Sequence, residues 1–463
     1  MIGLERLGVW ITKNPVIIIA VAVLLTLVSV HYAQQIESTG MTTESFVSKD
    51  SSLYQLYDHL YQENFGADGN IILIEGDNVA KADALSASLR LSDHTKMIPN
   101  VISVQSIADI VADAEYQSSG IRRIPSQERI DEILADAGSS VQGLMPDSRH
   151  TRMIVGMPTT ATLTESQRSE LLAEISSTVD FADFPAGYST TVTGDPSFQA
   201  AIVALMNSSN GSVLLLCGML MIVALLLVFR HVRWPLLPLP IVLLGIIWTI
   251  GAMGFFHIPM GMVTFAAFPI MIGLGIDYAI QFHNRIDEEL IKGKSPVEAA
   301  ISTVNHVAIP VAIAVTVTEA GFIALLSSTV PSINDFGKVC MIGLVMCYLS
   351  ALFVNTTVLY LSERKSRRKK KTAGHSDDGS AIGKSIEKTA FFCVRRWKAT
   401  LAVALILALA GNYADTLVPI ETDTKNYIPQ DLSPLIDLRH MKAFFGGTDT
   451  LKFLVQADDV TDP

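Results

Sequence analysis

Cysteines, charged side chains and aromatic rings are all scarce in this sequence. Only four of the 463 residues are cysteine, and none of them lies in the long polar stretch 34–206. A disulfide framework is therefore not expected, and the four thiols are interpreted as small buried hydrophobes. Charged residues make up 17% of the chain, hydrophobic residues 49%, and the mean hydropathy is +0.39. This composition indicates an integral membrane protein with a sizeable extramembrane part.

The motifs of common enzyme classes are also missing. The sequence contains no phosphate-binding loop, no histidine and cysteine cluster at metal-ligand spacing, and no nucleophile elbow. We therefore predict no cofactor and no metal ion, and we do not expect an enzyme. The stretch 34–206 has 24 acidic against 10 basic residues, which argues against nucleic acid as a partner. Such an acidic surface either attracts cationic amphiphiles or is simply well solvated.

Several long apolar runs dominate the rest of the chain. A helix needs about 20 apolar residues to cross a hydrocarbon core. We predict seven such spans, at 16–33, 213–229, 236–256, 262–282, 308–326, 339–361 and 399–415. The segment 1–15 is predicted to be an amphipathic helix on the cytoplasmic surface. The first span lacks a cleavage pattern of small residues, so it is interpreted as a retained anchor.

Basic residues set the predicted orientation. The sixth span is followed almost without a break by Arg364, Lys365, Arg367, Arg368, Lys369, Lys370 and Lys371. Positively charged loops face the cytoplasm, which places the linker 362–398 and the short loop with Arg230, His231 and Arg233 inside. The basic run either only sets orientation or also binds anionic lipid headgroups. The charged helical segment 284–305 and the N-terminus are then cytoplasmic, and 34–206 is extracytoplasmic. The sequence thus predicts a multi-pass protein of the cell (plasma or inner) membrane.

Strand and helix patterns alternate within 34–206. Strands are predicted at 70–75, 101–105, 152–157 and 189–193, and helices at 80–96, 126–137 and 164–179. Two units of the βαβ type favour a domain of the split βαβ, ferredoxin-like kind. The predicted fold class is therefore an α-helical membrane bundle with an extracytoplasmic α+β domain.

The segment 416–463 repeats features of the first half. Ile420-Glu421 matches Ile36-Glu37, and the stretch 431–435 matches 50–53. Phe445-Gly446 matches Phe65-Gly66, and 451–460 matches 71–79. Parallel repeats of whole bundles occur in transporters. We therefore expect a truncated piece or split product of a chain nearly twice as long, with the missing second half as its partner.

Asp277 places an ionisable carboxylate inside the predicted span 262–282. No charged residue lies between Met260 and Leu274, and the first basic residue after Asp277 is Arg285. A charge at this depth costs at least a few kcal/mol, so a proton or ion pathway is the usual reason for it. The alternatives are a polar contact that ties helices together, or a shallow position wetted from the cytoplasm.

Two glycines near Asp277 suggest how a carboxylate at this depth is accommodated. Gly273 lies one helical turn before Asp277 on the same face, and Gly275 lies nearby. Small residues let a neighbouring helix approach closely and shield the carboxylate from lipid. A buried acid of this kind is suited to taking up and releasing protons.

A series of short motifs in one order resembles the resistance-nodulation-division superfamily, most closely its MMPL-type and hydrophobe/amphiphile efflux members. Spans 2 to 6 also resemble a sterol-sensing domain. The motifs are Val192-Thr193-Gly194-Asp195-Pro196, Gly273-Leu274-Gly275-Ile276-Asp277-Tyr278, Gly293-Lys294-Ser295-Pro296 with Glu298-Ala299-Ala300, Thr318 with Gly321-Phe322, and Asp335-Phe336-Gly337.

This resemblance implies secondary transport, in which proton entry drives an outer porter domain that moves hydrophobic or amphiphilic molecules such as lipids. It implies Asp277 and Tyr278 as the proton relay, with Thr318 and Gly321 packed around it. Two features depart from the family pattern. A second Asp-Tyr pair, usual in span 10, is absent, and Glu319 stands where a small or hydroxylated residue is usual. Glu319 either shares a proton with Asp277 or lies near the outer half of its span, where it opens to water.

Other functions remain open at this point. One alternative is a sterol-sensing-like scaffold that binds lipid without pumping, and another is a protein-export accessory of the same superfamily. A homo-oligomer is also considered. Because half of the relay is missing, we expect the 463-residue chain alone to be inactive.

Overall fold

The computed structural model describes residues 2–36, 38, 43–48, 50–56, 67–158, 163–228, 234–365, 381–418 and 429–446. They fall into two compact units. The first draws on residues 1–362 and 429–463, and the second on residues 363–428. The first unit contains a helical bundle and an α+β domain, and the second contains two helices.

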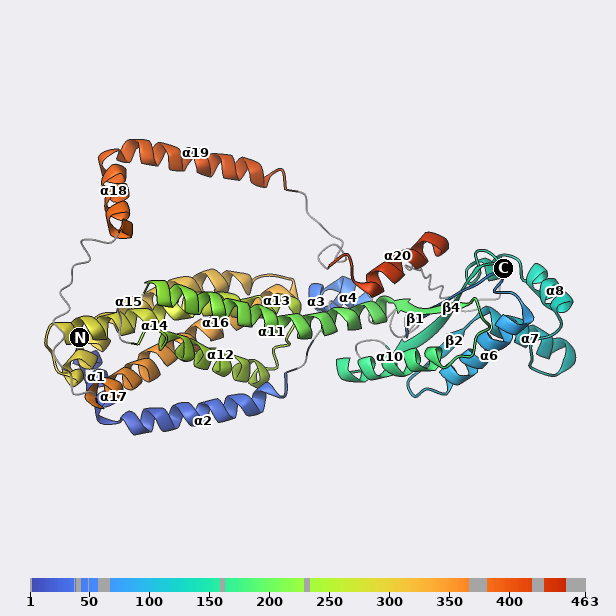
Figure 1. The fold of residues 1–463 in the computed structure, drawn as a ribbon, viewed down its shortest axis with the longest axis horizontal. Helices are drawn as coiled ribbons and strands as arrows, with labels where there is room; N and C mark the ends of the chain where they lie inside the picture. The colour runs from blue at the N-terminus through green and yellow to red at the C-terminus, as the bar shows by residue number, and fades with distance from the viewer. Residues whose placement is uncertain are drawn as a thin grey trace. The chain divides into compact units, whose positions relative to one another are not determined.

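Among the described residues, seven helices are long and apolar enough to cross a membrane, as the sequence predicts. The protein is therefore a multi-pass membrane protein. Figure 1 shows these helices, which are α2 (Pro15–Ala33), α11 (Asp195–Val228), α12 (Pro238–Phe255), α13 (Met262–Phe265) with α14 (Ala267–Ile291), α15 (Pro296–Leu325), α16 (Pro331–Leu349) with η2 (Ser350–Asn355) and α17 (Thr356–Lys365), and α19 (Trp397–Asp415).

Several helices differ from the predicted segments. The boundary expected at 206 falls inside α11, which runs without a break from Asp195 to Val228. The segment 284–305, expected as one cytoplasmic helix, is divided between α14 and α15, so that prediction is wrong. Gly293 ends the helical path with a φ of +90°, and Pro296 begins the next helix. The positive φ favours glycine, and proline suits the first helical position.

The bundle core is formed by helices α12, α14 and α16. Large apolar side chains from these helices pack together, including Trp248, Phe268, Met271 and Leu344. Helix α1 (Ile2–Lys13) joins this core through Ile11, which is fully buried. The amphipathic helix predicted at 1–15 is thus present as α1, which packs against α15 and leaves Glu5, Arg6 and Lys13 exposed, and its cytoplasmic location stays a prediction.

The α+β domain is built on a four-stranded sheet with the order β2-β3-β1-β4. The strands are β1 (Ala67–Glu75), β2 (Ser103–Gln105), β3 (His150–Pro158) and β4 (Ser189–Gly194), and all neighbours are antiparallel. Strand β3 lies between β1 and β2, which are therefore parallel to each other.

Five helices of the described chain connect these strands. They are α6 (Ala82–Lys96), α7 (Ile107–Ser119), α8 (Gln127–Ala137), α9 (Ser139–Gln142) and α10 (Glu165–Asp180). Helices α6 and α10 pack on one face of the sheet, and α7, α8 and α9 form a separate cluster with α6. Met153 and Val155 alternate with outward residues along β3 and pack with Leu91 of α6 and Ile175 of α10. The sequence analysis missed α7, although Ser106 caps it by accepting from the backbone N–H of Asp109.

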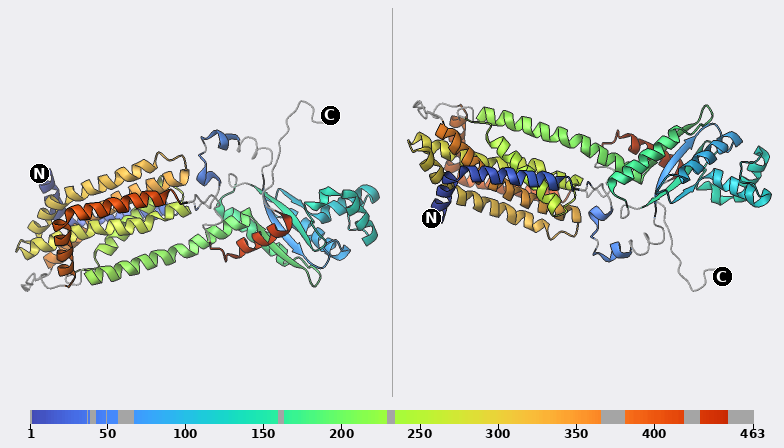
Figure 2. Two further views of the ribbon diagram at one scale, coloured as in Figure 1. Left: turned by 90° about the horizontal axis from the view of Figure 1, so that it is seen from above. Right: turned by 90° about the horizontal axis from the view of Figure 1, so that it is seen from below.

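The other face of the sheet is covered by α20 (Ser433–Phe445), from the segment predicted to begin a second repeat. Leu438 and Met441 of α20 are buried against Ile71 and Leu73 of β1. Figures 1 and 2 show α20, in dark red, beside the strands. The other repeat matches, at Ile420-Glu421 and 451–460, lie outside the described residues.

The second unit contains α18 (Ala381–Arg395) and α19. Helix α19 is mostly apolar and buries none of its side chains in the structure. Exposed Leu401, Leu405 and Leu409 are consistent with a helix whose surroundings are lipid. The basic run from Arg367 to Lys371 and the loop with Arg230, His231 and Arg233 lie outside the described residues.

Candidate functional site

Asp277 lies on the exposed face of α14. Gly273, Asp277, Gln281 and Asn284 are all exposed and follow one another at helical spacing, while Ile276, Ala279 and Phe282 on other faces are buried. Within the described part of the chain, the Asp277 carboxylate forms no hydrogen bond with a side chain or a backbone group. The stripe is therefore the face of α14 that the core of this bundle leaves uncovered.

Tyr278 and Glu319 lie near this carboxylate. Tyr278 is buried, with 6% of its surface exposed. Its hydroxyl lies close enough to the carboxyl groups of Asp277 and Glu319 for their charges to act on it. Glu319 of α15 is half-buried, and its Oε1 atom is buried without a hydrogen bond among the described residues. Cys340 of α16 is also within its electrostatic range. The structure thus gathers the three predicted relay residues into one region of the bundle.

The small residues predicted to pack around the relay differ in their surroundings. A Cβ on Gly275 would stand 2.9 Å from the Sγ atom of Cys347 on α16, so α14 and α16 are closely packed there, as expected. Gly273 and Gly321 have no atom within 4 Å of such a Cβ among the described residues. Thr318 donates its hydroxyl to the Ala314 carbonyl, 3.0 Å away in its own helix. Among the described residues a neighbouring helix thus reaches Gly275, while the packing predicted at Gly273 stays a prediction.

Asn355 is a functional candidate that the sequence analysis missed. It ends the π-helical turn η2 and is fully buried. Its Nδ2 donates to the Ala279 carbonyl, 2.9 Å away and two residues beyond Asp277. At the other end of the turn, the Ser350 hydroxyl donates to the Ile241 carbonyl at 2.7 Å. Single π turns are common at functional sites. The available sequence signal was an amide side chain within the predicted span 339–361.

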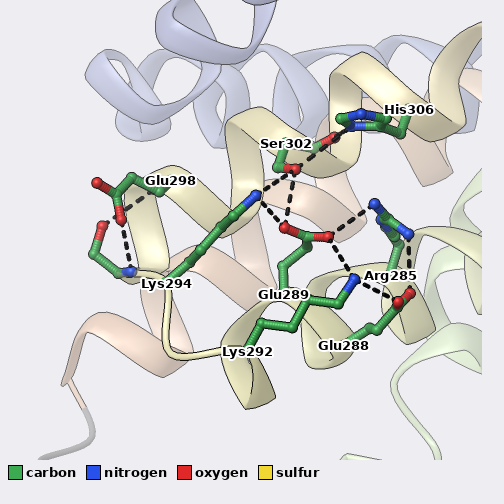
Figure 3. Close-up of polar contacts among 9 residues, drawn as sticks. Arg285, Glu288, Glu289, Lys292, Lys294, Glu298, Ser302 and His306 are labelled. Atoms are coloured by element: carbon green, nitrogen blue, oxygen red, sulfur yellow. Dashed lines mark hydrogen bonds and ion pairs between the residues drawn. The ribbon is translucent and has the colours of Figure 1, made fainter.

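A charged cluster joins α14 to α15, as Figure 3 shows. Its centre is Glu289, whose side chain is only 2% exposed and pairs with Lys294. Glu289 also accepts from Arg285 at 2.8 Å, Ser302 at 3.0 Å and Lys292 at 3.3 Å. These contacts fix the turn between the two helices.

This cluster explains the motif Gly293-Lys294-Ser295-Pro296. Gly293 supplies the left-handed turn, and Lys294 pairs with Glu289. Ser295 forms a capping box with Glu298, and Pro296 takes the first helical position of α15. The motif is therefore a helix-to-helix connection whose role is structural.

Comparison with known proteins identifies the family. The family model of the MMPL family matches residues 51–409, which is more than half of the chain. This protein belongs to the MMPL family. The resemblance to the MMPL branch of the resistance-nodulation-division superfamily is thereby confirmed.

Three curated relatives are similar to parts of the chain. Membrane protein MJ1562 of Methanocaldococcus jannaschii is 29% identical over 284 residues, covering 60% of this chain and 71% of that protein. The siderophore exporter MmpL5 of Mycobacterium tuberculosis is 24% identical over 398 residues, which are 78% of this chain and 39% of the exporter. The hopanoid transporter HpnN of Rhodopseudomonas palustris is 26% identical over 102 residues, or 22% of this chain and 12% of the transporter. The residues aligned with this MMPL chain are therefore well under half of the length of each of the two named transporters.

Proposed function

We propose that this MMPL protein is a secondary transporter, driven by the proton motive force, that exports hydrophobic or amphiphilic molecules, with lipids as the first candidates. Asp277 is the proton-carrying group, and Tyr278 and Glu319 complete the part of the relay that this bundle supplies. The single observation that carries the proposal is the Asp277 carboxylate, which is exposed on a membrane-spanning helix without a hydrogen-bond partner in the described chain.

A lone carboxylate on such a surface is unfavourable unless it is protonated or covered. Transfer of an ionised carboxyl group into hydrocarbon is costly, so the neutral form is favoured there. A site that is neutral when dry and ionised when wetted takes up and releases a proton as its exposure alternates. This property suits Asp277 to coupling proton movement to a conformational change.

A second helical bundle is the expected cover for this face. Gly273, Asp277 and Gln281 present a small, polar and hydrogen-bonding stripe, which suits a helix partner better than lipid. The aligned parts of MmpL5 and HpnN are 39% and 12% of those transporters. We therefore propose that the transporting unit includes a second half with its own bundle, and that the 463-residue chain alone does not transport.

The α+β domain is proposed to be the extracytoplasmic porter domain, with a ferredoxin-like arrangement. Its strand order and antiparallel directions support this assignment. The named relatives transport a siderophore and hopanoids, which supports hydrophobic or amphiphilic substrates for this family member. The N-terminus and the basic linker are proposed to be cytoplasmic.

Proton flux in proteoliposomes tests the proposal. The full-length protein, including any second half, is reconstituted, and proton uptake is recorded under an imposed pH gradient with and without amphiphile. We expect Asp277→Asn to abolish amphiphile-dependent flux and Asp335→Asn to preserve it. Asp335 is a suitable control because it is a membrane-domain acid that is already paired with Lys338 at 2.8 Å. Unchanged flux in folded Asp277→Asn would overturn the relay and favour lipid binding without pumping.

A further inference from the structure

Two histidines converge on one carboxylate where α20 meets the sheet. The Nε2 atom of His440, on α20, lies 2.9 Å from Oε1 of Glu75 at the end of β1. The Nε2 atom of His150, at the start of β3, lies 3.4 Å from the same oxygen. The Nδ1 atom of His150 lies 2.8 Å from Asp147 Oδ1. Glu75 therefore links a helix and a strand that are far apart in sequence.

Aromatic and apolar contacts complete this junction. The ring of His150 stacks on Phe444 of α20, with centroids 3.8 Å apart and an interplanar angle of 18°. The Arg152 guanidinium lies 5.0 Å from the centroid of the Phe445 ring. Leu438 and Met441 are buried against the strands. The apolar contacts dock α20 at any pH, whereas the contacts to Glu75 depend on charge.

We propose that His440, Glu75 and His150 form an acid-tightened clamp that strengthens the docking of α20 on the sheet as the pH falls below neutrality. Histidine is the side chain whose charge ordinarily changes between about pH 5 and 8. When the imidazoles are protonated, each pairs with Glu75 as an ion pair. When they lose their protons, two ion pairs become neutral hydrogen bonds or are lost.

Asp147 reinforces this dependence. Burial raises the pKa of Asp147, but hydrogen bonds from the backbone N–H of Arg149 and from His150 outweigh it and hold the pKa below its usual range. Two carboxylates thus face the imidazoles, Glu75 beside both histidines and Asp147 beside His150. The other charged groups on the adjoining elements are Asp68, Arg149, Arg152, Asp195, Asp437, Arg439 and Lys442.

The consequence concerns the conformation of the domain and does not depend on the proposed transport activity. Helix α20 follows the seventh span, whereas the sheet precedes the second span. A pH-dependent contact between them ties the two parts of the chain more firmly in acid. On the extracytoplasmic side proposed for this domain, the clamp would respond to external acidification.

Hydrogen exchange read by mass spectrometry tests the clamp in the complete 463-residue chain in detergent. Exchange of the amides of Ser433–Phe445 is measured at pH 5.5 and 7.5 and corrected for the intrinsic pH dependence of exchange. Because a surface ion pair contributes modestly, we expect roughly fivefold more protection at the lower pH. His440→Gln and Glu75→Gln should each remove this difference. His94→Gln, an exposed histidine of α6, is the matched control and should retain it.

Peptides from β1 monitor folding in the same samples. Pronounced protection of Ile71–Ile74 in every variant shows that the sheet is intact, so any loss of pH dependence belongs to the clamp. Equal protection of α20 at both pH values in the wild type would overturn the proposal. A pH dependence that survives in both His440→Gln and Glu75→Gln would overturn it as well.

Discussion

Gly275 and Cys347 are so close that α14 and α16 have no room for a side chain between them. A Cβ at Gly275 would stand 2.9 Å from Cys347 Sγ and 3.0 Å from its Cβ. Gly245 of α12 meets the same cysteine, since a Cβ there would lie 2.8 Å from its Cα. Cys347 therefore occupies the junction of three core helices, α12, α14 and α16.

Gly275→Val is expected to destabilise the bundle by about 2 kcal/mol, because overpacking forces helices apart. Gly273→Val is the matched control two residues away, where nothing lies within 4 Å among the described residues. We expect no loss of stability for the control. Thermal unfolding of the detergent-solubilised protein measures both. Equal melting temperatures for the two variants would show that the contact with Cys347 is not tight.

Asn355→Ala is expected to destabilise the bundle by about 1–2 kcal/mol, because it removes a buried hydrogen bond and leaves the Ala279 carbonyl without this donor. The bond is 2.9 Å long and connects η2 to α14. Thr357→Ala serves as the control, since that hydroxyl donates to the Phe353 carbonyl one turn earlier in the same span and not to another helix of the bundle. Denaturant unfolding of both variants in the same detergent is the measurement. Indistinguishable midpoints would argue against a role for Asn355 in fixing α14.

Glu289→Ala is expected to destabilise the α14–α15 connection by about 3 kcal/mol, because a buried carboxylate is lost while its cationic partners remain. Lys294, Arg285 and Lys292 all contact this carboxylate. The neighbouring Glu288 is 50% exposed and pairs with Arg285 and Lys292 at the surface. Glu288→Ala should therefore leave the melting temperature unchanged. A larger effect at Glu288 than at Glu289 would contradict this interpretation of Figure 3.

Asp109 gives the α+β domain a predictable response to acid. Burial raises the pKa of Asp109, but hydrogen bonds from Lys96, Ser106 and Ser92 outweigh it and hold the pKa below its usual value. Arg122 also contacts this carboxylate at 2.6 Å. Because the folded pKa is the lower one, the stabilisation is complete above the unfolded pKa of about 3.9 and is lost as the pH falls through the folded value.

We therefore expect Asp109→Asn to reduce the protection of α6 and α7 amides near neutral pH, by about 2 kcal/mol of local stability. The wild type should lose this advantage below about pH 4, where the two proteins converge. Asp113→Asn, whose side chain is 61% exposed, is the control and should behave like the wild type. Hydrogen exchange across pH 3 to 7 provides the comparison. A difference in amide protection between wild type and Asp109→Asn that grows as the pH falls would contradict this prediction.

Local patterns predicted a large part of this structure. The seven spans follow from hydropathy, which depends only on the residues within each segment. The strands at 70–75 and 152–157 lie inside β1 and β3, because alternation of apolar residues along a strand is also local. Helix α7 was missed because acids share its buried face: Asp109 and Glu115 are buried along with Ile107 and Val111, which weakens the periodic apolar signal.

The sequence alone determined that an acid stands in an apolar span, that glycine and proline divide α14 from α15, and that the motifs belong to one family. Tertiary structure decided which face of α14 carries Asp277, that Asn355 reaches the Ala279 carbonyl, and that His440 meets Glu75. These three facts depend on contacts between residues far apart in the chain. Such contacts are set by how whole helices and strands pack, and the periodicity of a single segment does not encode them.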